Sequence, residues 1–572
     1  MDTGDVEVSA EGSSEKPVAP STVRSQKPIS KGEMFRADST NLESWLRTSN
    51  KKAKFEANLE AIDTARTLIA TNQAPTAEQQ LALAKYTGWG MFPEIWNGQA
   101  DTQWMRDELD KRLTPEENSQ ARESTTNAHY TSAAVIREVW KGLDRLGFKG
   151  GRILEPSVGT GNFFGWMPDS VLNHDRTRLV GVELDTTTAM ITKLLYPNAD
   201  FLNTAFEDTK IDNNTFDLAI SNVPFGSYRI FDPEINARYG ERTGLRIHNY
   251  FFARSMNLVR PGGLVVFITS TGTMDTATGK AFRETLARNA ELVAAYRLPM
   301  ETFKANAGTE VTADIIILRK KGGNGADLNA DDQDFWLHTP TNMYTPPDMA
   351  YWEAAQYFKG NPYFRENPDN VLGEWTKAKT SQGFRLGVKT RPGEDGMRLL
   401  RTQMAKLPRH VYKTSEKAAD ESKPLATVKK DTDYFEQKKI GRLTSDTDEK
   451  GKKTIYVETP DGREIATIPA AAQKRVLDYI DIRDAMLESI ATQLANKPAA
   501  EKEGARAALK KAYESFVKQH GPVNASKNVR SYAGDPEVAL VLAMEQLGED
   551  KKTWSVRKEL FEGDTINVYE PP

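Results

Sequence analysis

Residues 221–225 carry the side chains needed to hold a planar group that bears an exocyclic amine. Their sequence is Ser-Asn-Val-Pro-Phe, and they follow an apolar run, 216–220, that is typical of a strand. The Asn222 amide and the next backbone carbonyl can accept the amine's hydrogens, Pro224 stiffens the turn, and the Phe225 ring can stack on the planar face. Enzymes that extrude a base from DNA can hold an adenine in this way. The same pattern also makes an ordinary turn, so its meaning depends on the residues upstream.

A glycine loop lies upstream of this segment. Residues 153–163 read Ile-Leu-Glu-Pro-Ser-Val-Gly-Thr-Gly-Asn-Phe, and they too leave an apolar run. Gly159 and Gly161 let the backbone approach a ligand closely and adopt conformations that other residues avoid. Because parallel sheets bind ligands outside the carboxyl ends of their strands, we expect Glu155 and the two glycines to line a ligand site.

Two further strand-like runs lead to acidic residues. The run 179–184 contains Glu183 near its end, where a carboxylate is suited to bind ribose hydroxyls. The next run leads into Glu207 and Asp208; either acid could face the ligand, and we assign Asp208. A glycine loop, two strand-end acids and the Asn-X-Pro-Phe segment, in that order, are far more specific than any one of these motifs.

This series resembles the amino-methyltransferases that use S-adenosylmethionine to methylate adenine N6 in DNA. Residues 155–163 look like their cofactor loop, and residues 222–225 look like their catalytic Asn-Pro-Pro-Phe/Tyr. Val223 stands where that motif usually has a proline, but the backbone carbonyl is present whatever the side chain. Residues 129–132 resemble the segment that closes over the methionine end of the cofactor. The order of the motifs is similar to the group whose target-recognition region lies C-terminal.

The resemblance implies a role for each motif residue. The cofactor contacts are expected at Tyr130, Thr131, Glu155, Pro156, Gly159, Gly161, Phe163, Glu183 and Asp208, and the catalytic residues are expected to be Asn222, Pro224 and Phe225. Hydrogen bonds from N6 to Asn222 and to a backbone carbonyl would relocalise the amine lone pair, while Phe225 holds the base in line with the methyl group. Catalysis would then be mainly positioning, without a metal or a covalent enzyme intermediate.

A wider resemblance extends over most of residues 80–547. The segments that carry it are 86–90, 247–252, 260–263, 306–312, 361–364, 371–373 and 513–517, which look like parts of very large methylase–helicase proteins of phages and conjugative plasmids, including defence-against-restriction proteins. This chain ends about where the helicase of those proteins would begin, so we expect either a separate helicase partner or direct binding to DNA. The resemblance also implies a mobile-element protein that protects its own DNA from restriction.

The composition suits a multi-domain protein of the cytoplasm. The chain has 572 residues, 38% hydrophobic residues and a mean hydropathy of −0.59, which leaves room for a sizeable core beside long polar segments. The absence of cysteine excludes disulfides, cysteine-ligated zinc and cysteine nucleophiles. The six histidines have no metal-ligand spacing, and no signal peptide or membrane-length apolar run is found. We expect a location in the host cytoplasm, with packaging in a phage particle as an alternative, and no membrane association.

The charge of the chain is unevenly placed. The net charge is −4, but residues 376–430 contain 14 Lys and Arg against 5 Asp and Glu. Such a run can be a solvated linker or a strip that contacts phosphates. Arg229, Arg242 and Arg246 add positive charge after the Asn motif.

The chain divides into five parts and a tail. We predict a disordered segment at 1–40, a helical region at 41–125, a methyltransferase core at 126–322, a mixed and partly basic region with possible target recognition at 323–470, a helical region at 471–547 and a tail at 548–572. Alternating strand-like and helix-like runs in the core predict an α/β, Rossmann-like sheet flanked by helices. Further strands are expected at 264–269, 292–298 and 313–318, with a short strand pair at 454–457 and 464–468. Trp89, between two glycines, is expected to fill a hydrophobic gap.

Three functions remain open. The leading hypothesis is adenine-N6 methylation of DNA. A non-catalytic methyltransferase fold that binds DNA or belongs to a particle is the second. The third is methylation of glutamine or another amide, because Asn-X-Pro-Phe can grip any planar amine. The chain length and the basic run favour the DNA reading.

Overall fold

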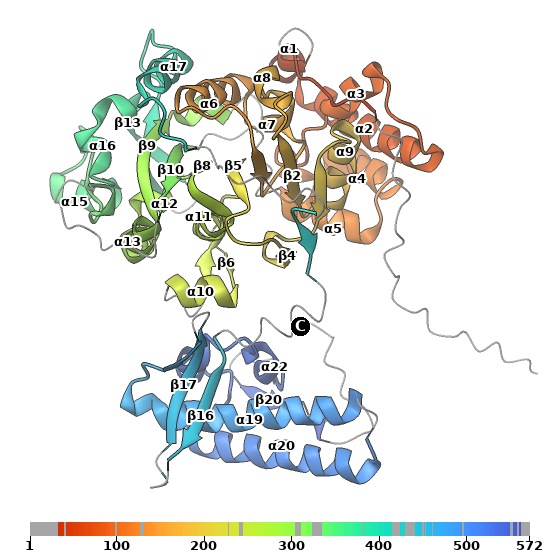
Figure 1. Ribbon diagram of the computed structural model, residues 1–572, viewed down its shortest axis with the longest axis vertical. Coiled ribbons are helices and arrows are strands. Elements are labelled where there is room, and N and C mark those ends of the chain that lie inside the picture. Colours follow the sequence, from red (N-terminus) through yellow and green to blue (C-terminus); the bar gives the residue numbers. More distant parts are fainter. Residues whose placement is uncertain are drawn as a thin grey trace, which may run out of the picture.

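The structure of the protein is a computed structural model with an upper and a lower lobe (Figure 1). The residues that it describes are 32–38, 42–97, 100–125, 131–226, 228–239, 244–303, 311–322, 335–380, 383–413, 424–429, 441–448, 451, 453–459, 462–494, 497–548, 553–557 and 560–561. Among the predicted features, Tyr130, Arg242 and most of the segment 306–312 lie outside the described residues.

A seven-stranded sheet forms the centre of the upper lobe. Its strands are β1 (Arg152–Glu155), β2 (Arg178–Glu183), β3 (Asp200–Asn203), β5 (Phe216–Asn222), β8 (Val259–Ser270), β9 (Ala290–Leu298) and β10 (Ala313–Lys320). Their order is β3-β2-β1-β5-β8-β10-β9. The first five strands in this order are parallel, and β10 runs antiparallel to both of its neighbours. The predicted α/β class is confirmed, and the three further strands lie where the sequence predicted them.

The sheet is buried on both faces because successive side chains of a strand point to opposite sides. In β1, Ile153 belongs to one hydrophobic core and Leu154 to the other. Helices α6 (Ala133–Arg145) and α9 (Thr186–Leu195) contribute to the first core, and α11 (Ile247–Leu258) and α13 (Lys280–Asn289) to the second. Burial on both faces explains why these strands are near-continuous apolar runs in the sequence.

The N-terminal helices pack beside this sheet. They are α1 (Ser44–Thr48), α2 (Lys51–Thr71), α3 (Ala77–Ala84), α4 (Gln103–Asp110) and α5 (Pro115–Ser124). Side chains cap several of them: Thr76 and Thr114 each form a capping box at the start of a helix. Both α2 and α3 contact α9. Trp89 is 1% exposed and packs edge-on against Phe55 and Phe92, in agreement with its predicted role as a gap filler.

The chain after the sheet folds back onto it. Its elements are β11 (Thr341–Asn342), α15 (Tyr351–Tyr357), β12 (Lys359–Gly360), α16 (Tyr363–Glu366), the hairpin strands β13 (Glu374–Thr380) and β14 (Gly383–Lys389), α17 (Gly396–Lys406) and β15 (Thr427–Val428). Helix α17 packs on α6. Strand β15 pairs with β4 (Thr209–Lys210), which follows β3 in the chain. The basic run of the sequence is therefore divided among several structural units of the upper lobe.

A buried arginine joins this returning segment to the sheet. Arg297, on β9, is 1% exposed and ion-pairs with Asp314 on β10 at 2.8 Å and with Asp275 at 2.7 Å. Its guanidinium lies 4.2 Å from the ring centroid of Phe364. Asn361 is also buried; its backbone N–H donates to Asp275, and its amide donates to two backbone carbonyls. The Asn-Pro-Tyr-Phe segment 361–364 thus has a structural role here.

The lower lobe has a hydrophobic core of its own. Its elements are β16 (Leu443–Thr447), β17 (Lys453–Thr459), β18 (Gly462–Ile465), α19 (Ala470–Leu494), α20 (Ala499–His520), α21 (Ser526–Tyr532), α22 (Val538–Leu542), β19 (Glu545–Leu547) and β20 (Trp554–Val556). The predicted strand pair is present as β17 and β18. Leu443 and Ile455 of the strands share one core with Tyr479 of α19, so the predicted boundary at 470 falls inside this lobe. Among the described residues, no helix is long and apolar enough to cross a membrane.

The remaining short elements connect these units. They are α7 (Asn162–Gly165), α8 (Asp169–Leu172), β6 (Arg229–Ile230), α10 (Pro233–Tyr239), β7 (Leu245–Arg246) and α12 (Gly272–Asp275), with 3-10 turns at Pro93–Trp96, Ala100–Thr102, Phe206–Asp208, Ala277–Gly279, Met300–Phe303, Phe335–Leu337 and Pro368–Asn370.

Candidate functional site

Three predicted residues lie at the carboxyl ends of neighbouring parallel strands. Glu155 ends β1, Glu183 ends β2 and Asn222 ends β5. In the sheet, β1 lies between β2 and β5. The site is therefore built at one edge of the sheet, where open parallel sheets bind their ligands.

The glycine loop leaves β1 in a conformation that requires glycine. Gly159 and Gly161 have φ angles of +52° and +71°, a region that side chains with a Cβ rarely adopt. A Cβ at Gly161 would lie 2.3 Å from the ring of Tyr196, so the backbone also passes too close to that ring for any other residue. The Thr192 hydroxyl donates to the Gly159 carbonyl at 2.5 Å and holds the loop against α9.

Glu183 ties this loop to the end of β2. One carboxylate oxygen accepts a hydrogen bond from the Gly159 N–H and the other accepts one from the Asp185 N–H, each at 2.9 Å. Burial, followed by the charge of Asp185, raises the pKa of Glu183 to about 7, although the two backbone donors act in the opposite direction. Because one Glu183 oxygen is bonded to the glycine loop, a ligand that binds at this loop would change the surroundings of the carboxyl group.

The carboxyl group of Glu155 is buried at the end of β1. Glu155 is 2% exposed, and its Oε2 atom has no hydrogen-bond partner among the described residues. Burial, with the nearby charge of Glu183, raises the pKa of Glu155 well above its ordinary range. A buried polar atom without a partner is costly, so this oxygen is suited to accept a hydrogen bond from a bound group.

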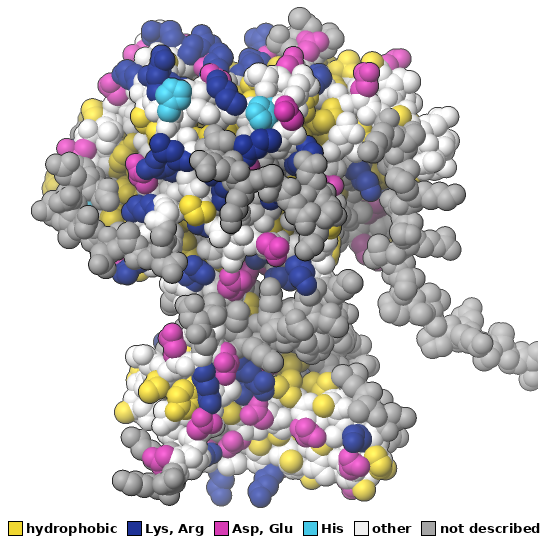
Figure 2. All heavy atoms as spheres, viewed as in Figure 1, with side chains coloured by type: hydrophobic (Ala, Val, Ile, Leu, Met, Phe, Trp, Pro, Cys, Tyr) yellow, Lys and Arg dark blue, Asp and Glu magenta, His cyan; other side chains and the backbone are white. Residues whose placement is uncertain are grey.

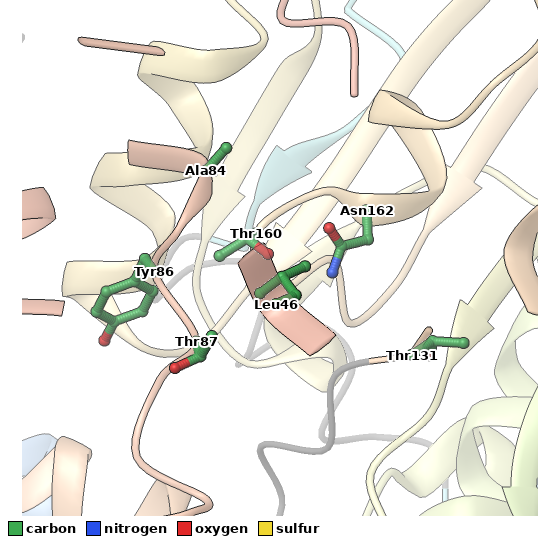
Figure 3. Close-up of a pocket in the computed structure, with 7 residues that line it drawn as sticks. All are labelled: Leu46, Ala84, Tyr86, Thr87, Thr131, Thr160 and Asn162. Atoms are coloured by element: carbon green, nitrogen blue, oxygen red, sulfur yellow. The ribbon is translucent and has the colours of Figure 1, made fainter. Parts of the chain in front are cut away.

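A small pocket opens beside the glycine loop (Figure 3). It is lined by Leu46, Ala84, Tyr86, Thr87, Thr131, Thr160 and Asn162 and has an empty volume of about 270 Å³, including space open to solvent. The lining residues come from the N-terminal helical region, from the start of α6 and from the loop itself. Thr131 is buried, and its hydroxyl has no hydrogen-bond partner within the described part of the chain. The resemblance segment 86–90 thus supplies one wall of this pocket.

The other predicted cofactor residues have different surroundings. Pro156 is buried directly after β1. Phe163 is 2% exposed and packs in the core below the loop, where its backbone carbonyl accepts a hydrogen bond from the Trp140 indole. The side chain of Asp208 is exposed, whereas Glu207 is partly buried and burial raises its pKa. Of these two acids, Glu207 is therefore the one with the more enclosed carboxyl group.

The Asn-Val-Pro-Phe loop follows β5 at the same edge. The hydroxyl of Ser221 donates to the carbonyl of Ser157 at 3.2 Å, which joins this loop to the glycine loop. Val223 is 1% exposed in the core, and its N–H donates to Ile268 of β8 at 3.0 Å. Pro224 and Phe225 are partly exposed. The Val223 side chain therefore packs in the core. Valine also has the backbone N–H that forms this hydrogen bond, which a proline would lack.

Two residues near this loop were not predicted to belong to the site. His248 and Asn249, in the first turn of α11, are buried, and the Asn249 Oδ1 has no hydrogen-bond partner among the described residues. Burial, then the charge of Arg246, lowers the pKa of His248 to about 4, and interaction with the Gly226 backbone acts in the opposite direction. The imidazole is therefore neutral at pH 7. In the sequence, His248 was marked only by its place in segment 247–252, which resembles the methylase–helicase proteins.

The basic run is spread over separate surfaces. Lys377, Lys379, Arg385 and Lys389 all lie on the β13–β14 hairpin, while other basic residues lie on α17. Figure 2 shows basic side chains gathered near the top of the upper lobe. Lys429, after β15, instead donates through its backbone N–H to the Asp208 carbonyl at 2.8 Å. Four basic side chains of the run thus lie together on one hairpin.

The strand order, the single reversed strand and the glycine loop between β1 and α7 define the fold of class I S-adenosylmethionine-dependent methyltransferases. The predicted resemblance to restriction-modification methylases is confirmed as well: residues 169–302 match the family model of the Eco57I restriction-modification methylase. Defense against restriction protein B of Escherichia phage P1 is 29% identical to the chain over 274 residues. That match covers 48% of this chain and 10% of the phage protein, so the chain spans about a tenth of its relative.

Solved methyltransferase structures are similar in part. A candidate class I S-adenosylmethionine-dependent methyltransferase from Listeria monocytogenes is 17% identical, with 48% of this chain and 91% of that chain covered and a TM-score of 0.31. The methyltransferase subunit of a type I restriction-modification system from Streptococcus thermophilus is 14% identical, with 50% and 84% covered and a TM-score of 0.31.

Proposed function

We propose that the protein transfers a methyl group from S-adenosylmethionine to the N6 amine of adenine in DNA. The observation that carries this proposal is that the two predicted loops meet. Asn222 and Glu155 end adjacent strands, and the bond from Ser221 to Ser157 holds the loops together. A cofactor held by the glycine loop and an amine held by Asn222 would therefore be neighbours.

The residues at the edge of β1 and β2 fit this cofactor. Gly159 and Gly161 allow close approach of a ligand to the backbone, and the free oxygen of Glu155 can accept a hydrogen bond from an amine or a hydroxyl. Glu183 would accept hydrogen bonds from ribose hydroxyls, and the Thr131 hydroxyl, at the pocket beside the loop, would be a further contact. S-adenosylmethionine, when bound, supplies an electrophilic methyl group.

The acceptor side of the reaction depends on Asn222 and the two residues after Val223. The Asn222 side chain and the Val223 carbonyl would accept the hydrogens of the adenine amine, so that its lone pair is no longer delocalised into the ring. Phe225, partly exposed beside the loop, would stack on the base, and Pro224 stiffens the turn between them. The chain's contribution is thus orientation, which can account for a large part of a barrier.

The biological role is proposed from the family alone. The name of the phage relative indicates defence against restriction, and we propose that this protein likewise protects DNA of a phage or other mobile element, in the host cytoplasm. The basic β13–β14 hairpin supports direct contact with DNA, since Lys and Arg supply most sequence-independent affinity. A separate helicase partner stays a prediction.

Methyl transfer is tested by incubating the protein with labelled S-adenosylmethionine and DNA and digesting the product to nucleosides. We expect the label in N6-methyladenine. Asn222→Ala should abolish transfer while calorimetry shows nearly unchanged cofactor affinity, because Asn222 faces the amine. Asn173→Ala, an exposed asparagine after α8, is the matched control and should keep full activity.

Three results would contradict the proposal. Transfer that persists in Asn222→Ala would show that another group holds the amine. Label in 5-methylcytosine would assign a different base. Absence of cofactor binding by the folded protein would favour the non-catalytic alternative, and label in a glutamine-containing peptide but not in DNA would favour the amide methyltransferase.

A further inference from the structure

Large aromatic side chains are exposed on two neighbouring elements of the returning segment. On α15, Tyr351, Trp352 and Tyr357 are 69%, 70% and 51% exposed, and on β14 Phe384 is 44% exposed. Single exposed apolar residues are common and need no explanation. We call these four exposed rings on two packed elements the aromatic platform.

The register of the hairpin brings these elements together. Leu386 is buried in one cluster with Ala354 of α15 and Phe358, which directly follows α15, so α15 covers the face of the hairpin that carries Leu386. Side chains two residues apart in a strand share a face, so Phe384 lies on that same face, beyond the covered part. The platform therefore has rings on the helix and one ring near the end of the hairpin.

Basic side chains are interleaved with these rings. Lys377 and Lys379 lie directly opposite Leu386 and Phe384 in the antiparallel register, so they share the same face. The Lys377 ammonium lies 4.3 Å from the ring centroid of Phe384 and ion-pairs at 3.0 Å with Asp348, shortly before α15. Lys379 is exposed. Lys379 is thus the exposed cation beside the Phe384 ring, while Lys377 packs on that ring and is paired with Asp348.

The platform flanks the edge of the sheet that holds the candidate active site. Leu372, just before β13, donates from its N–H to the carbonyl of Arg297, near the end of β9, at 2.9 Å. Val388 of β14 donates to the Thr312 hydroxyl at 3.1 Å, just before β10 begins. The end of β9 and the start of β10 lie at the same edge as the end of β8, and β5 is parallel to β8. The hairpin is therefore attached at the edge where Asn222 lies.

Stacking on bases is the interaction that this combination fits best. A protein partner could cover exposed rings, but it would give no reason for lysines placed among them. Proteins that hold a single strand combine a basic track for the backbone with aromatic rings on which unpaired bases stack. Base pairs inside a duplex do not offer their faces to such rings.

We propose that the aromatic platform binds unpaired bases of a single-stranded DNA segment beside the methylation site. This inference extends the proposed function by naming the form of DNA that is bound, and it rests on that function only for the choice of DNA. It concerns a separate site, because none of the platform residues is part of the glycine loop or the Asn-Val-Pro-Phe loop.

Fluorescence anisotropy with labelled oligothymidine and with a blunt duplex of the same length tests this proposal in the full chain. The double variant Tyr351→Ala/Trp352→Ala should bind oligothymidine at least about tenfold more weakly, because it removes two rings on which bases would stack. Its affinity for the duplex should change much less. Trp352→Phe keeps a ring and should retain most of the affinity. Trp104→Ala, which removes a 41% exposed tryptophan from α4, is the matched control.

The results separate this proposal from methyl transfer. Unchanged binding of oligothymidine by the double variant would overturn the platform, as would equal losses for duplex and single strand. A double variant that keeps its affinity for oligothymidine but loses association with another protein would assign the surface to protein contacts and overturn it too. If the wild-type protein binds oligothymidine through the platform yet methylates no DNA, the proposed function fails and the platform stands.

Discussion

At the scale of single residues, two carboxyl groups with raised pKa values make the candidate cofactor site sensitive to pH. Glu155 and Glu183 end neighbouring strands, and the pKa of Glu183 is raised to about 7 from an ordinary value of 4.5. Between these values the folded protein keeps a proton that the unfolded chain has lost. Stability therefore falls as the pH rises from about 4.5 to 7, and the effect is complete above 7.

Cofactor binding should release protons in the same pH range. Hydroxyl donors from a bound ribose would favour the charged carboxylate and lower the pKa of Glu183. Calorimetry near pH 6.5 in buffers of different ionisation enthalpy should show release of up to about one proton per cofactor, and little release at pH 8.5. Glu183→Gln should remove most of this release. A release that the variant leaves unchanged would exclude Glu183 as its source.

The sequence predicted the residues of the site unevenly. The positions of Glu155, Glu183 and Asn222 at strand ends were predictable because each ends an apolar run, and parallel strands bring such ends together. The choice between Glu207 and Asp208 depends on the direction of each side chain in a 3-10 turn, which no periodicity reveals. His248 lies in a helix that is buried all round, so its polar ring has no pattern that distinguishes it.

At the scale of elements, Arg297 holds the returning segment against the sheet. Arg297→Met would leave the fully buried Asp314 without its partner. We expect a loss of about 3–5 kcal/mol in the free energy of unfolding, measured by urea denaturation. Arg391→Met, which breaks an exposed ion pair with Glu394, is the control and should cost no more than about 1 kcal/mol. Equal effects of the two variants would show that the buried network contributes little.

The β13–β14 hairpin is the element on which DNA affinity should depend. Replacing Lys377, Lys379, Arg385 and Lys389 with alanine should weaken DNA binding and flatten its dependence on salt, because fewer counterions are released. Lys377 and Lys389 already ion-pair with Asp348 and Glu374. The slope of log affinity against log salt should therefore change by less than the loss of four phosphate contacts would give. Binding measured from low to moderate salt gives both quantities.

A charge-matched control for the hairpin lies in the lower lobe. Alanine at Lys502, Lys510, Lys511 and Lys518 of α20 removes the same charge and should leave the slope nearly unchanged. If the hairpin variant keeps both its affinity and its slope, the basic run is a solvated surface, and a partner protein that brings the chain to DNA becomes the better explanation.

Elements with local signals were predictable from the sequence, and those that depend on distant pairing were not. The core strands are apolar runs of ordinary length, which a buried parallel sheet requires. By contrast, β4 and β15 are two residues each, and their pairing joins positions far apart in the chain. The aromatic platform likewise needs the hairpin register, which the sequence does not specify around a polar strand pair.

At the scale of the whole molecule, the two lobes have separate cores and should unfold separately. In the lower lobe, Asp535 is fully buried, ion-pairs with Arg483 and accepts the Leu443 N–H. Asp535→Ala leaves a buried charge and should lower one calorimetric transition, at a cost of about 3–5 kcal/mol. Asp446→Ala, which removes an exposed ion pair with Arg463 in the same lobe, should have little effect. Cofactor affinity should be unchanged in both; a parallel loss of affinity would show that the lobes are coupled.

The pocket beside the glycine loop also sets an order of events during translation. All of its lining residues lie between positions 46 and 162, so its walls leave the ribosome before β9, β10 and the β13–β14 hairpin are made. Domains are completed from the N-terminus as synthesis proceeds. The core behind these walls also contains Leu298, Ile315 and Leu400, so the pocket can form only after the upper lobe has been made through α17.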